Sequence, residues 1–346
     1  MPAINLTTTT YTQNFNTLES SGSPSSIMPT GWEFLESGTN NANNTYGIDD
    51  GTSPPGNTYS YGTGNTNDRA LGGLRSNNLI PTLGVSFTNN TGSTIRSLAI
   101  NYRGEQWRLG AVNRTDRLDF QYSLDATSLL STGSWVDFNS LDFSSVVTTG
   151  PLGALNGNAS QNSANLSGTI SGLSIANGEK FYLRWQDLDV PGPDDGLAID
   201  DFSLTPTLNL APTNISLSPS NVDENVLANT LVGNFSSTDP DTGNTFTYSL
   251  VTDPNYPDNT AFTISNTGQL KTNAALDFET KPTYNILVRT TDAGGLSYDK
   301  PLTVNLNNVN EAPTNLSLSP SNVDENVLAN TLVGNFSSTD PDTGNT

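Results

Sequence analysis

The sequence predicts an all-β protein that is built from β-sandwich domains. Apolar residues recur at every second position in short runs, helix-forming stretches are nearly absent, and Gly, Asn, Asp and Pro separate the runs. Short alternating runs between turn-forming residues are typical of antiparallel strands with one buried face. A long internal repeat further indicates that part of the chain is an array of small domains.

The repeat sets the domain organisation. Residues 211–245 recur as residues 312–346 with a single difference, Ile215 against Leu316. The spacing of 101 residues is too long for a solenoid unit and suits independent domains in a row. We therefore expect a first β-sandwich over 1–205, a complete repeat over 206–311 and a truncated second copy over 312–346. Because the second copy holds only the beginning of the unit, we expect the sequence to be a piece of a longer protein.

The alternation predicts strands on both sides of a linker. Runs with period two lie at 98–102, 118–122, 181–185, 246–250, 284–288 and 302–306. The segment 204–213 has two prolines and no charge, as a short linker should. All four tryptophans precede this segment, so the two regions differ in chemistry as well as in position.

Composition excludes several classes of function. Thirty-four acidic residues against 13 basic ones give a net charge of −21, which repels nucleic acid and anionic lipid but attracts divalent cations where carboxylates converge. The chain has no Cys and no His, so thiol and imidazole chemistry are excluded. We expect no nucleic-acid partner and, without a run of eighteen apolar residues, no membrane-spanning segment. The first residues lack the pattern of a signal peptide, which favours type I secretion.

Carboxylates gather in short groups along the repeat. These groups are VDEN (222–225), TDPDTGN (238–244), LDFE (276–279), TTDAGG (290–295) and NNVNEAP (307–313). Each group alone is what a turn or a solvated loop contains. As a set they offer the six to eight oxygen ligands that calcium prefers, so a calcium site is the stronger interpretation of the set.

The same groups follow the order and spacing of a known family. An early glutamate and a D-x-D-x-G turn are followed by FTISNTGQL (262–270), LDFE, VRTTDAGG (288–295) and NVNEAP (308–313). The unit resembles a cadherin repeat of the bacterial type, which implies an Ig-like Greek-key β-sandwich with calcium between consecutive repeats. The resemblance implies that the upper repeat supplies Glu224, Asp277, Glu279, Asn310 and Glu311. It implies that the lower repeat supplies Asp340, Asp342 and Asn345.

Two departures from the family pattern lower the expected affinity. Asn308 stands where the family usually has Asp, which removes one charge from the junction. The upstream linker LNLAPT (208–213) contains no glutamate and follows no D-x-E motif. We therefore expect only a half-site, with weak or no calcium binding, at Asp239, Asp241 and Asp292.

The first region has a signature of its own. It contains YTQNFNTL (11–18), YRGEQWR (102–108) and a closing GLAIDDFSL (196–204). It resembles jelly-roll β-sandwich modules of secreted bacterial proteins, related to carbohydrate-binding and MAM-type domains. A glycan site is one interpretation of Tyr102, Glu105, Trp107 and Arg108. The alternative, which we favour, places both aromatic rings in the core or at its rim and pairs Glu105 with Arg108.

Other acidic motifs in the first region carry weaker hypotheses. DLDVPGPDDGLAID (187–200) fits an EF-hand loop at Asp187 and Asp189, but Pro191 and the lack of a glutamate at position twelve do not fit. A structural calcium at Asp200 or Asp201 stays open beside a solvated hairpin. Adjacent strand residues point to opposite faces, so this pair cannot act together on one sugar. We expect no catalytic site.

The expected function is calcium-dependent adhesion at the cell surface or outside the cell. The expected partners are calcium, other copies of the chain, and glycans or proteins of a cell surface or matrix. Two alternatives remain: a non-catalytic accessory region of a large secreted enzyme of nuclease or phosphatase type, and a glycan-binding module.

Overall fold

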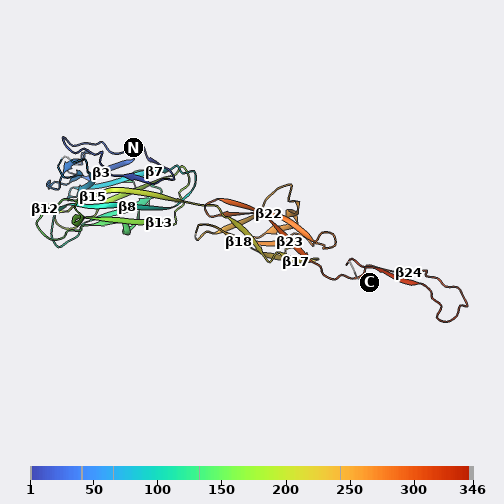
Figure 1. Cartoon of the computed structure of the whole chain (residues 1–346). Helices are drawn as coiled ribbons and strands as arrows, with labels where there is room; N and C mark the ends of the chain where they lie inside the picture. The colour runs from blue at the N-terminus through green and yellow to red at the C-terminus, as the bar shows by residue number, and fades with distance from the viewer. Residues whose placement is uncertain (1, 40–41, 65, 132, 242, 343–346) are drawn as a thin grey trace. The chain divides into compact units, whose positions relative to one another are not determined.

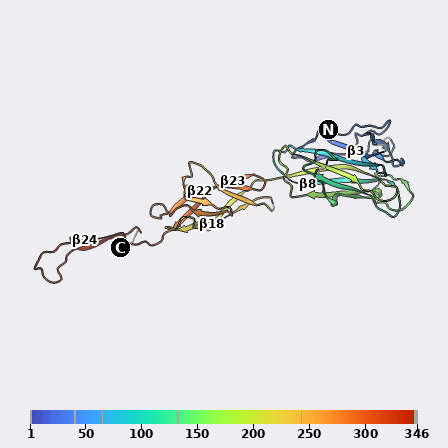
Figure 2. The same cartoon turned by 180° about the vertical axis from the view of Figure 1, so that it is seen from behind.

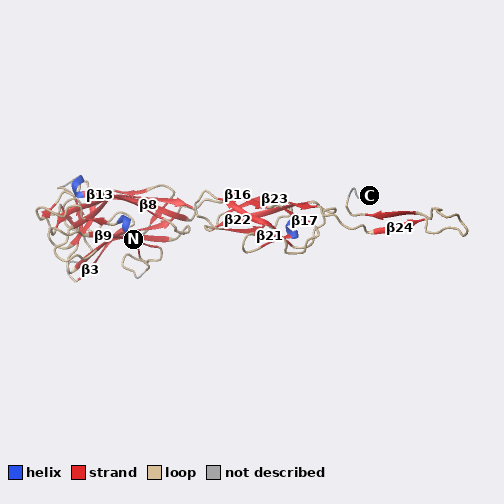
Figure 3. Ribbon diagram, turned by 90° about the horizontal axis from the view of Figure 1, so that it is seen from below, coloured by secondary structure: helices blue, strands red, loops and turns tan. Residues whose placement is uncertain are grey.

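The computed structural model describes residues 2–342 apart from 40, 41, 65, 132 and 242. The chain forms two compact units, Met1–Asn209 and Leu210–Thr346, called unit 1 and unit 2 here. In the described residues regular structure is almost entirely strand, with three short 3-10 helices (Figure 3). The all-β prediction is therefore confirmed. Unit 1 extends past residue 205 because its last strand, β15 (Gly196–Leu208), continues through Pro206.

Unit 1 is a sandwich of two large sheets, with β3 and β7 in one layer and β8 and β13 in the other (Figure 1). The first sheet consists of β1 (Ile4–Leu6), β3 (Trp32–Gly38), β7 (Leu79–Asn89), β9 (Arg117–Ser123), β10 (Val136–Asp137), β11 (Phe143–Ser144) and β14 (Lys180–Asp187). The second consists of β2 (Tyr11–Gln13), β4 (Gly47–Asp49), β5 (Asn57–Tyr61), β6 (Ala70–Leu74), β8 (Ile95–Leu109), β12 (Gly153–Ala154), β13 (Ser163–Ile170) and β15. Two 3-10 turns, η1 (Asn139–Leu141) and η2 (Ser160–Asn162), lie in the connections.

Aromatic side chains fill the space between the two sheets of unit 1. Trp32 of β3 stacks on Trp185 of β14 with ring centroids 5.8 Å apart, and Phe202 of β15 meets both rings edge-on. The predicted alternation at 98–102 is confirmed, because Leu98, Ile100 and Tyr102 are buried. Burying such side chains is the main source of stability in a domain without disulfides.

Unit 2 begins with a smaller sandwich of two four-stranded sheets, seen from the other side in Figure 2. One sheet consists of β16 (Asn214–Ser218), β18 (Leu231–Thr238), β21 (Gln269–Thr272) and β20 (Phe262–Ile264). The other consists of β17 (Asn221–Asp223), β23 (Ser297–Asn307), β22 (Thr283–Asp292) and β19 (Phe246–Leu250). The turn η3 (Pro257–Ala261) precedes β20. Ile215, Ile286 and Val304 lie in the core between the sheets.

The second copy forms a two-stranded hairpin of β24 (Asn315–Ser319) and β25 (Asn335–Thr339). Its register reproduces that of β16 with β18, since Leu316 pairs with Ser338 as Ile215 pairs with Ser237. Ile215 is 0% exposed, whereas Leu316 is 76% exposed. In the first copy the opposite sheet of β17, β19, β22 and β23 covers the apolar face, whereas in the described residues β24 and β25 pair only with each other. The two nearly identical segments therefore fold alike locally, but the apolar face is buried only where a second sheet is present.

Candidate metal centre

Glu224 ties three segments of unit 2 together. It directly follows β17 and is buried, and its carboxylate accepts the N–H of Phe278 at 2.7 Å and the N–H of Val309 at 2.9 Å. Two backbone donors hold the carboxylate in one orientation and satisfy it away from water. Glu224 therefore fixes the LDFE loop and the linker that follows β23 beside each other.

Two further glutamates meet Glu224 at this place. Glu224, Glu279 and Glu311, called the glutamate triad here, each bring one carboxylate oxygen within 4.8 Å of the others. Oε1 of Glu279 accepts a hydrogen bond from Nδ2 of Asn308 at 2.9 Å. Oε1 of Glu311 accepts one from Nδ2 of Asn225 at 2.7 Å. All three glutamates were expected as ligands, and the structure brings them together.

The charge of the triad is poorly balanced by protein groups. The Oε2 of Glu279 is buried and has no hydrogen-bond partner among the described residues. The pKa of Glu279 is raised, first by burial and then by the charges of Glu224, Glu311 and Asp342. Like charges held this close repel one another, and a divalent cation would reverse the sign of that interaction. Oxygen-only donors with an unpartnered buried oxygen fit calcium.

Asp342 and Asp340 of the second copy complete the acidic set. The N–H of Glu311 donates to Oδ2 of Asp342 at 2.6 Å, and the N–H of Asp342 donates to Oδ1 of Asp340 at 3.0 Å. Oδ1 of Asp342 is buried without a hydrogen-bond partner in the described part of the chain. Asn310 lies in the linker, where its Nδ2 donates to the carbonyl of Glu311 at 3.1 Å. The predicted ligand Asn345 lies outside the described residues.

Asp277, another predicted ligand, makes local hydrogen bonds in this structure. Its carboxylate is exposed and accepts both the N–H and the Oγ1 hydroxyl of Thr280 at 2.9 Å. These two hydrogen bonds lower the pKa of Asp277. In this conformation Asp277 caps its own turn and stands apart from the triad, because a short Asp side chain finds local backbone donors first.

Asn225 is a residue that the sequence analysis named only as part of an acidic group. Its φ of +57° lies in the left-handed region, and its Nδ2 is the donor to Glu311. Asn tolerates this conformation better than other non-glycine residues. The Asn that directly follows Glu224 could therefore have been used to predict a tight turn at the site.

The upstream half-site is built in the same way as the downstream one. The N–H of Leu210 donates to Oδ2 of Asp241 at 2.7 Å, and the N–H of Asp241 donates to Oδ1 of Asp239 at 2.8 Å. Oδ1 of Asp292 accepts the N–H of Leu296 at 2.9 Å. Leu210 occupies the position of Glu311 in the repeat. The backbone geometry of a junction is present here, but this linker position offers no carboxylate.

The proposed glycan residues of unit 1 are mostly interior. Tyr102 and Trp107 are buried, and Trp107 stacks on Tyr61 with ring centroids 5.7 Å apart. A buried ring has no free face for a sugar, so the glycan interpretation of these two aromatics is corrected in favour of the core.

The expected pairing of Glu105 with Arg108 is wrong. Glu105 accepts the Nε1 of Trp107 at 3.0 Å and pairs with Nε of Arg103 at 3.4 Å. Arg108 donates instead to the carbonyl of Gly51 at 2.9 Å. Burial raises the pKa of Glu105 to about 7. Glu105 and Arg108 diverge because they lie three positions apart on β8, where side chains alternate between faces.

Comparison with known proteins supports the resemblance seen in the repeat. Residues 218–307 match the Cadherin domain family. Among solved structures the chain is similar to protocadherin gamma B7 extracellular cadherin domains 1–4, at 19% identity over 48% of this chain and 46% of that one, with a TM-score of 0.28. It is similar to the human desmocollin-1 ectodomain at 20% identity over 50% and 37% of the two chains, with a TM-score of 0.30. The chain thus spans less than half of these ectodomain chains.

A third similarity covers much of a smaller protein. TmCBM61, solved in complex with β-1,4-galactotriose, shares 11% identity over 56% of this chain and 94% of its own, with a TM-score of 0.28.

In the described residues, no helix is long and apolar enough to cross a membrane.

Proposed function

We propose that unit 2 is a calcium-binding adhesion module of a protein that works outside the cell or at its surface. The observation that carries the proposal is the glutamate triad, with its unpartnered oxygen on Glu279, next to the acids of a second copy of the same unit. The match of residues 218–307 to the Cadherin domain family supports it. The proposed role is non-catalytic.

Glu224, Glu279 and Glu311 would hold the ion from the complete repeat, and Asp340 and Asp342 would hold it from the second copy. A bound calcium ion supplies positive charge that cancels the repulsion among these carboxylates. Glu224 keeps the LDFE loop and the linker together through its backbone hydrogen bonds. The contact between Glu311 and Asp342 links the last residue of one repeat to the D-x-D turn of the next.

The proposal explains why the unit is repeated at a constant interval. A calcium site at a junction needs the glutamates of one copy and the D-x-D turn of the following copy. Consecutive copies of the same unit therefore supply the two halves of each site. Because the ion binds only the folded arrangement, it stabilises the array by mass action, by about 2.7 kcal/mol at a calcium concentration 100 times Kd. We expect other copies of the chain, or glycans or proteins of a surface or matrix, to be the partners of such an array.

Adhesion is tested with beads that carry the full chain. We expect the beads to cluster, or to be retained on cell-surface material, in calcium but not in chelator. Glu279→Gln should abolish the effect because it removes one charge from the triad. Glu325→Gln is the matched control: Glu325 repeats Glu224 in the second copy and is exposed there. Adhesion that persists in chelator, or that survives Glu279→Gln, would contradict the proposal.

A further inference from the structure

A carboxylate occupies a core position at the end of β14 in unit 1. Phe181, Leu183, Trp185 and Asp187 share one face of this strand, and all four are almost fully buried. The first three pack in the main core. Asp187 is 0% exposed, so the strand directs a charged group into the interior at the point where a leucine or an aromatic residue would continue the pattern.

The protein does not satisfy this carboxylate. Neither Oδ1 nor Oδ2 of Asp187 has a hydrogen-bond partner among the described residues. Arg75 lies nearby, but its Nη1 donates to the backbone carbonyl of Asp187 at 2.7 Å, and its Nε lies 3.5 Å from Oδ1 of the exposed Asp189. Buried carboxyl groups without partners are rare, since the loss of hydration is not repaid.

Two more acids of the same region share this condition. Asp194 and Asp116 are buried, and Oδ1 of each has no hydrogen-bond partner in the described structure. Burial first, and then the charges of Asp194 and Asp116, raise the pKa of Asp187 well above its ordinary range. Burial and the charge of Asp116 raise the pKa of Asp194 to about 7. The three carboxyl groups therefore repel one another and leave four oxygens unpartnered.

A fourth buried acid of the same region, Asp195, has hydrogen-bond donors for its carboxylate. Asp195 accepts the N–H of Gly110 at 2.7 Å, the hydroxyl of Ser145 at 2.6 Å and the Nε2 of Gln106 at 2.9 Å. The chain thus supplies donors for Asp195 but not for its neighbours. The lack of donors at Asp187 is a property of that position and not of the whole region.

The charge balance points the same way. Arg114 binds Oδ2 of Asp116 at 2.7 Å and stands 3.7 Å from Oδ1 of Asp194. The buried carboxyl groups of Asp116, Asp187, Asp194 and Asp195 therefore outnumber the guanidinium group that pairs with acids among them, that of Arg114, because Arg75 pairs with Asp189. A divalent cation would offset part of this negative charge.

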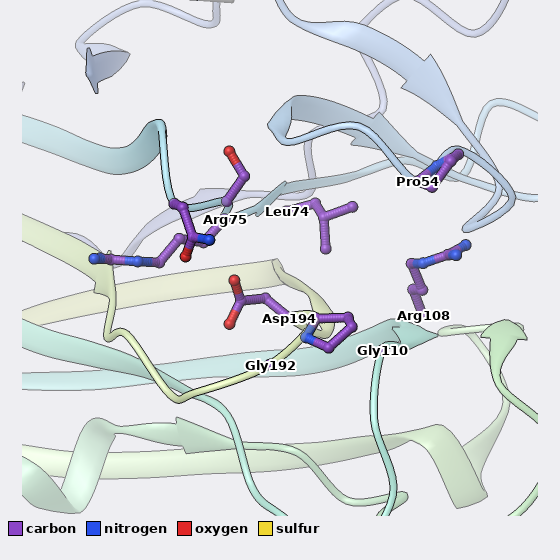
Figure 4. A pocket seen from close by; sticks show the side chains of 10 residues that line it. Pro54, Leu74, Arg75, Arg108, Gly110, Gly192 and Asp194 are labelled. Atoms are coloured by element: carbon purple, nitrogen blue, oxygen red, sulfur yellow. The ribbon is translucent and has the colours of Figure 1, made fainter. Parts of the chain in front are cut away.

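A cavity gives this region access to solvent. It has a volume of about 430 Å³ and is lined by Arg75, Arg108, Gly110 and Asp194 among others. Figure 4 shows the carboxylate of Asp194 extending into this space. A cation could enter here and keep water among its ligands, as calcium sites commonly do.

We propose that Asp187, Asp194 and Asp116 form a divalent-cation site of the calcium class in unit 1. In the described residues only the glutamate triad has ligand atoms mutually within 4.8 Å. In unit 1, therefore, at most two of the three acids would bind the ion directly in this arrangement, and water that enters through the cavity would supply the remaining ligands. The site is independent of the junction in unit 2 and of the function proposed for it.

Terbium luminescence tests this site in the full chain. Terbium replaces calcium at oxygen sites, and its emission excited through tryptophan requires a nearby indole. All four tryptophans lie in unit 1, and Trp185 is two residues from Asp187 on the same strand face. Sensitised emission therefore reports metal bound close to a tryptophan of unit 1. We expect saturable emission that calcium displaces.

Variants decide which acids hold the metal. Asp187→Asn keeps the shape of the side chain and should weaken terbium binding at least tenfold, with near-ultraviolet circular dichroism as the check of folding. If that variant does not fold, Asp194→Asn, at the cavity wall, must show the same loss. Asp200→Asn, another buried acid of unit 1, should keep the emission. Absent emission in the natural sequence, emission that persists in both Asp187→Asn and Asp194→Asn, or an equal loss in Asp200→Asn would overturn the proposal and leave Asp187 as a neutral buried acid.

Discussion

The backbone N–H of Glu311 donates a 2.6 Å hydrogen bond to Oδ2 of Asp342. One repeat earlier, the N–H of Leu210 makes the same bond to Oδ2 of Asp241 at 2.7 Å. The two linkers therefore fold against the D-x-D turn alike, and they differ in the side chain that the linker residue carries. A glutamate at this position joins the triad, whereas a leucine cannot.

Glu224 should be needed for the fold of unit 2 even without calcium. A glutamine in its place has one acceptor oxygen, so either Phe278 or Val309 loses its hydrogen bond to the side chain. We expect Glu224→Gln to lower the free energy of unfolding in chelator by about 1–3 kcal/mol. Chemical denaturation measures this change.

The repeat supplies the control for that prediction. Glu325 has the same sequence surroundings but is exposed, so Glu325→Gln should change the free energy of unfolding by less than about 0.5 kcal/mol. Equal effects of the two variants would show that burial and the hydrogen bonds of Glu224 do not account for the loss.

Replacing equivalent apolar residues by alanine should change the free energy of unfolding differently in the two copies, because only one of the residues is buried. Ile215 lies in the core of unit 2, and Leu316 is its exposed counterpart. Ile215→Ala should cost about 2–5 kcal/mol of unfolding free energy because it leaves a cavity. Leu316→Ala should lie within about 0.5 kcal/mol of the natural sequence. A large cost for Leu316→Ala would mean that the hairpin packs against a partner in solution.

Unit 1 should lose stability as the pH rises. Burial first, and then the charges of Glu105, Asp201 and Asp68, raise the pKa of Asp200 from 3.8 to about 8, against the hydrogen bond from the N–H of Asp201. Glu105, which also pairs with Arg103, is shifted in the same direction. The folded state therefore holds protons that the unfolded state releases, and the free energy of unfolding falls between pH 4 and pH 8.

Each such group contributes up to about 1.4 kcal/mol per pH unit in that window. Asp200→Asn should flatten the dependence, measured as the melting temperature of the tryptophan-detected transition in chelator. A slope that is unchanged in the variant would show that Asp200 is ionised in the folded protein.

Most of the junction can be predicted from the sequence because its motifs are local. The glutamates of VDEN, LDFE and NVNEAP converge as the resemblance implied, since the parallel strands β17 and β23 end, and the antiparallel strand β22 begins, at the same end of the sandwich. Motif order could not show that Thr280 offers Asp277 two local donors, so these hydrogen bonds were not predicted. Asp187 was read only as part of a loop, although its spacing from Phe181, Leu183 and Trp185 marked it as inward-facing. Which buried acids lack donors depends on contacts between distant segments, which the sequence does not display.

Thermal unfolding of unit 2 in calcium and in chelator tests the central claim most directly. Tryptophan emission follows unit 1 alone, so a calorimetric transition that is silent in tryptophan emission belongs to unit 2. Calcium at about 100 times Kd should raise that transition by about 10 °C or more. Asp342→Asn should remove most of the rise, whereas Asp241→Asn, its counterpart beside Leu210, should retain it. Equal melting temperatures in calcium and chelator, or equal losses in the two variants, would contradict a calcium-bound junction at Glu311 and Asp342.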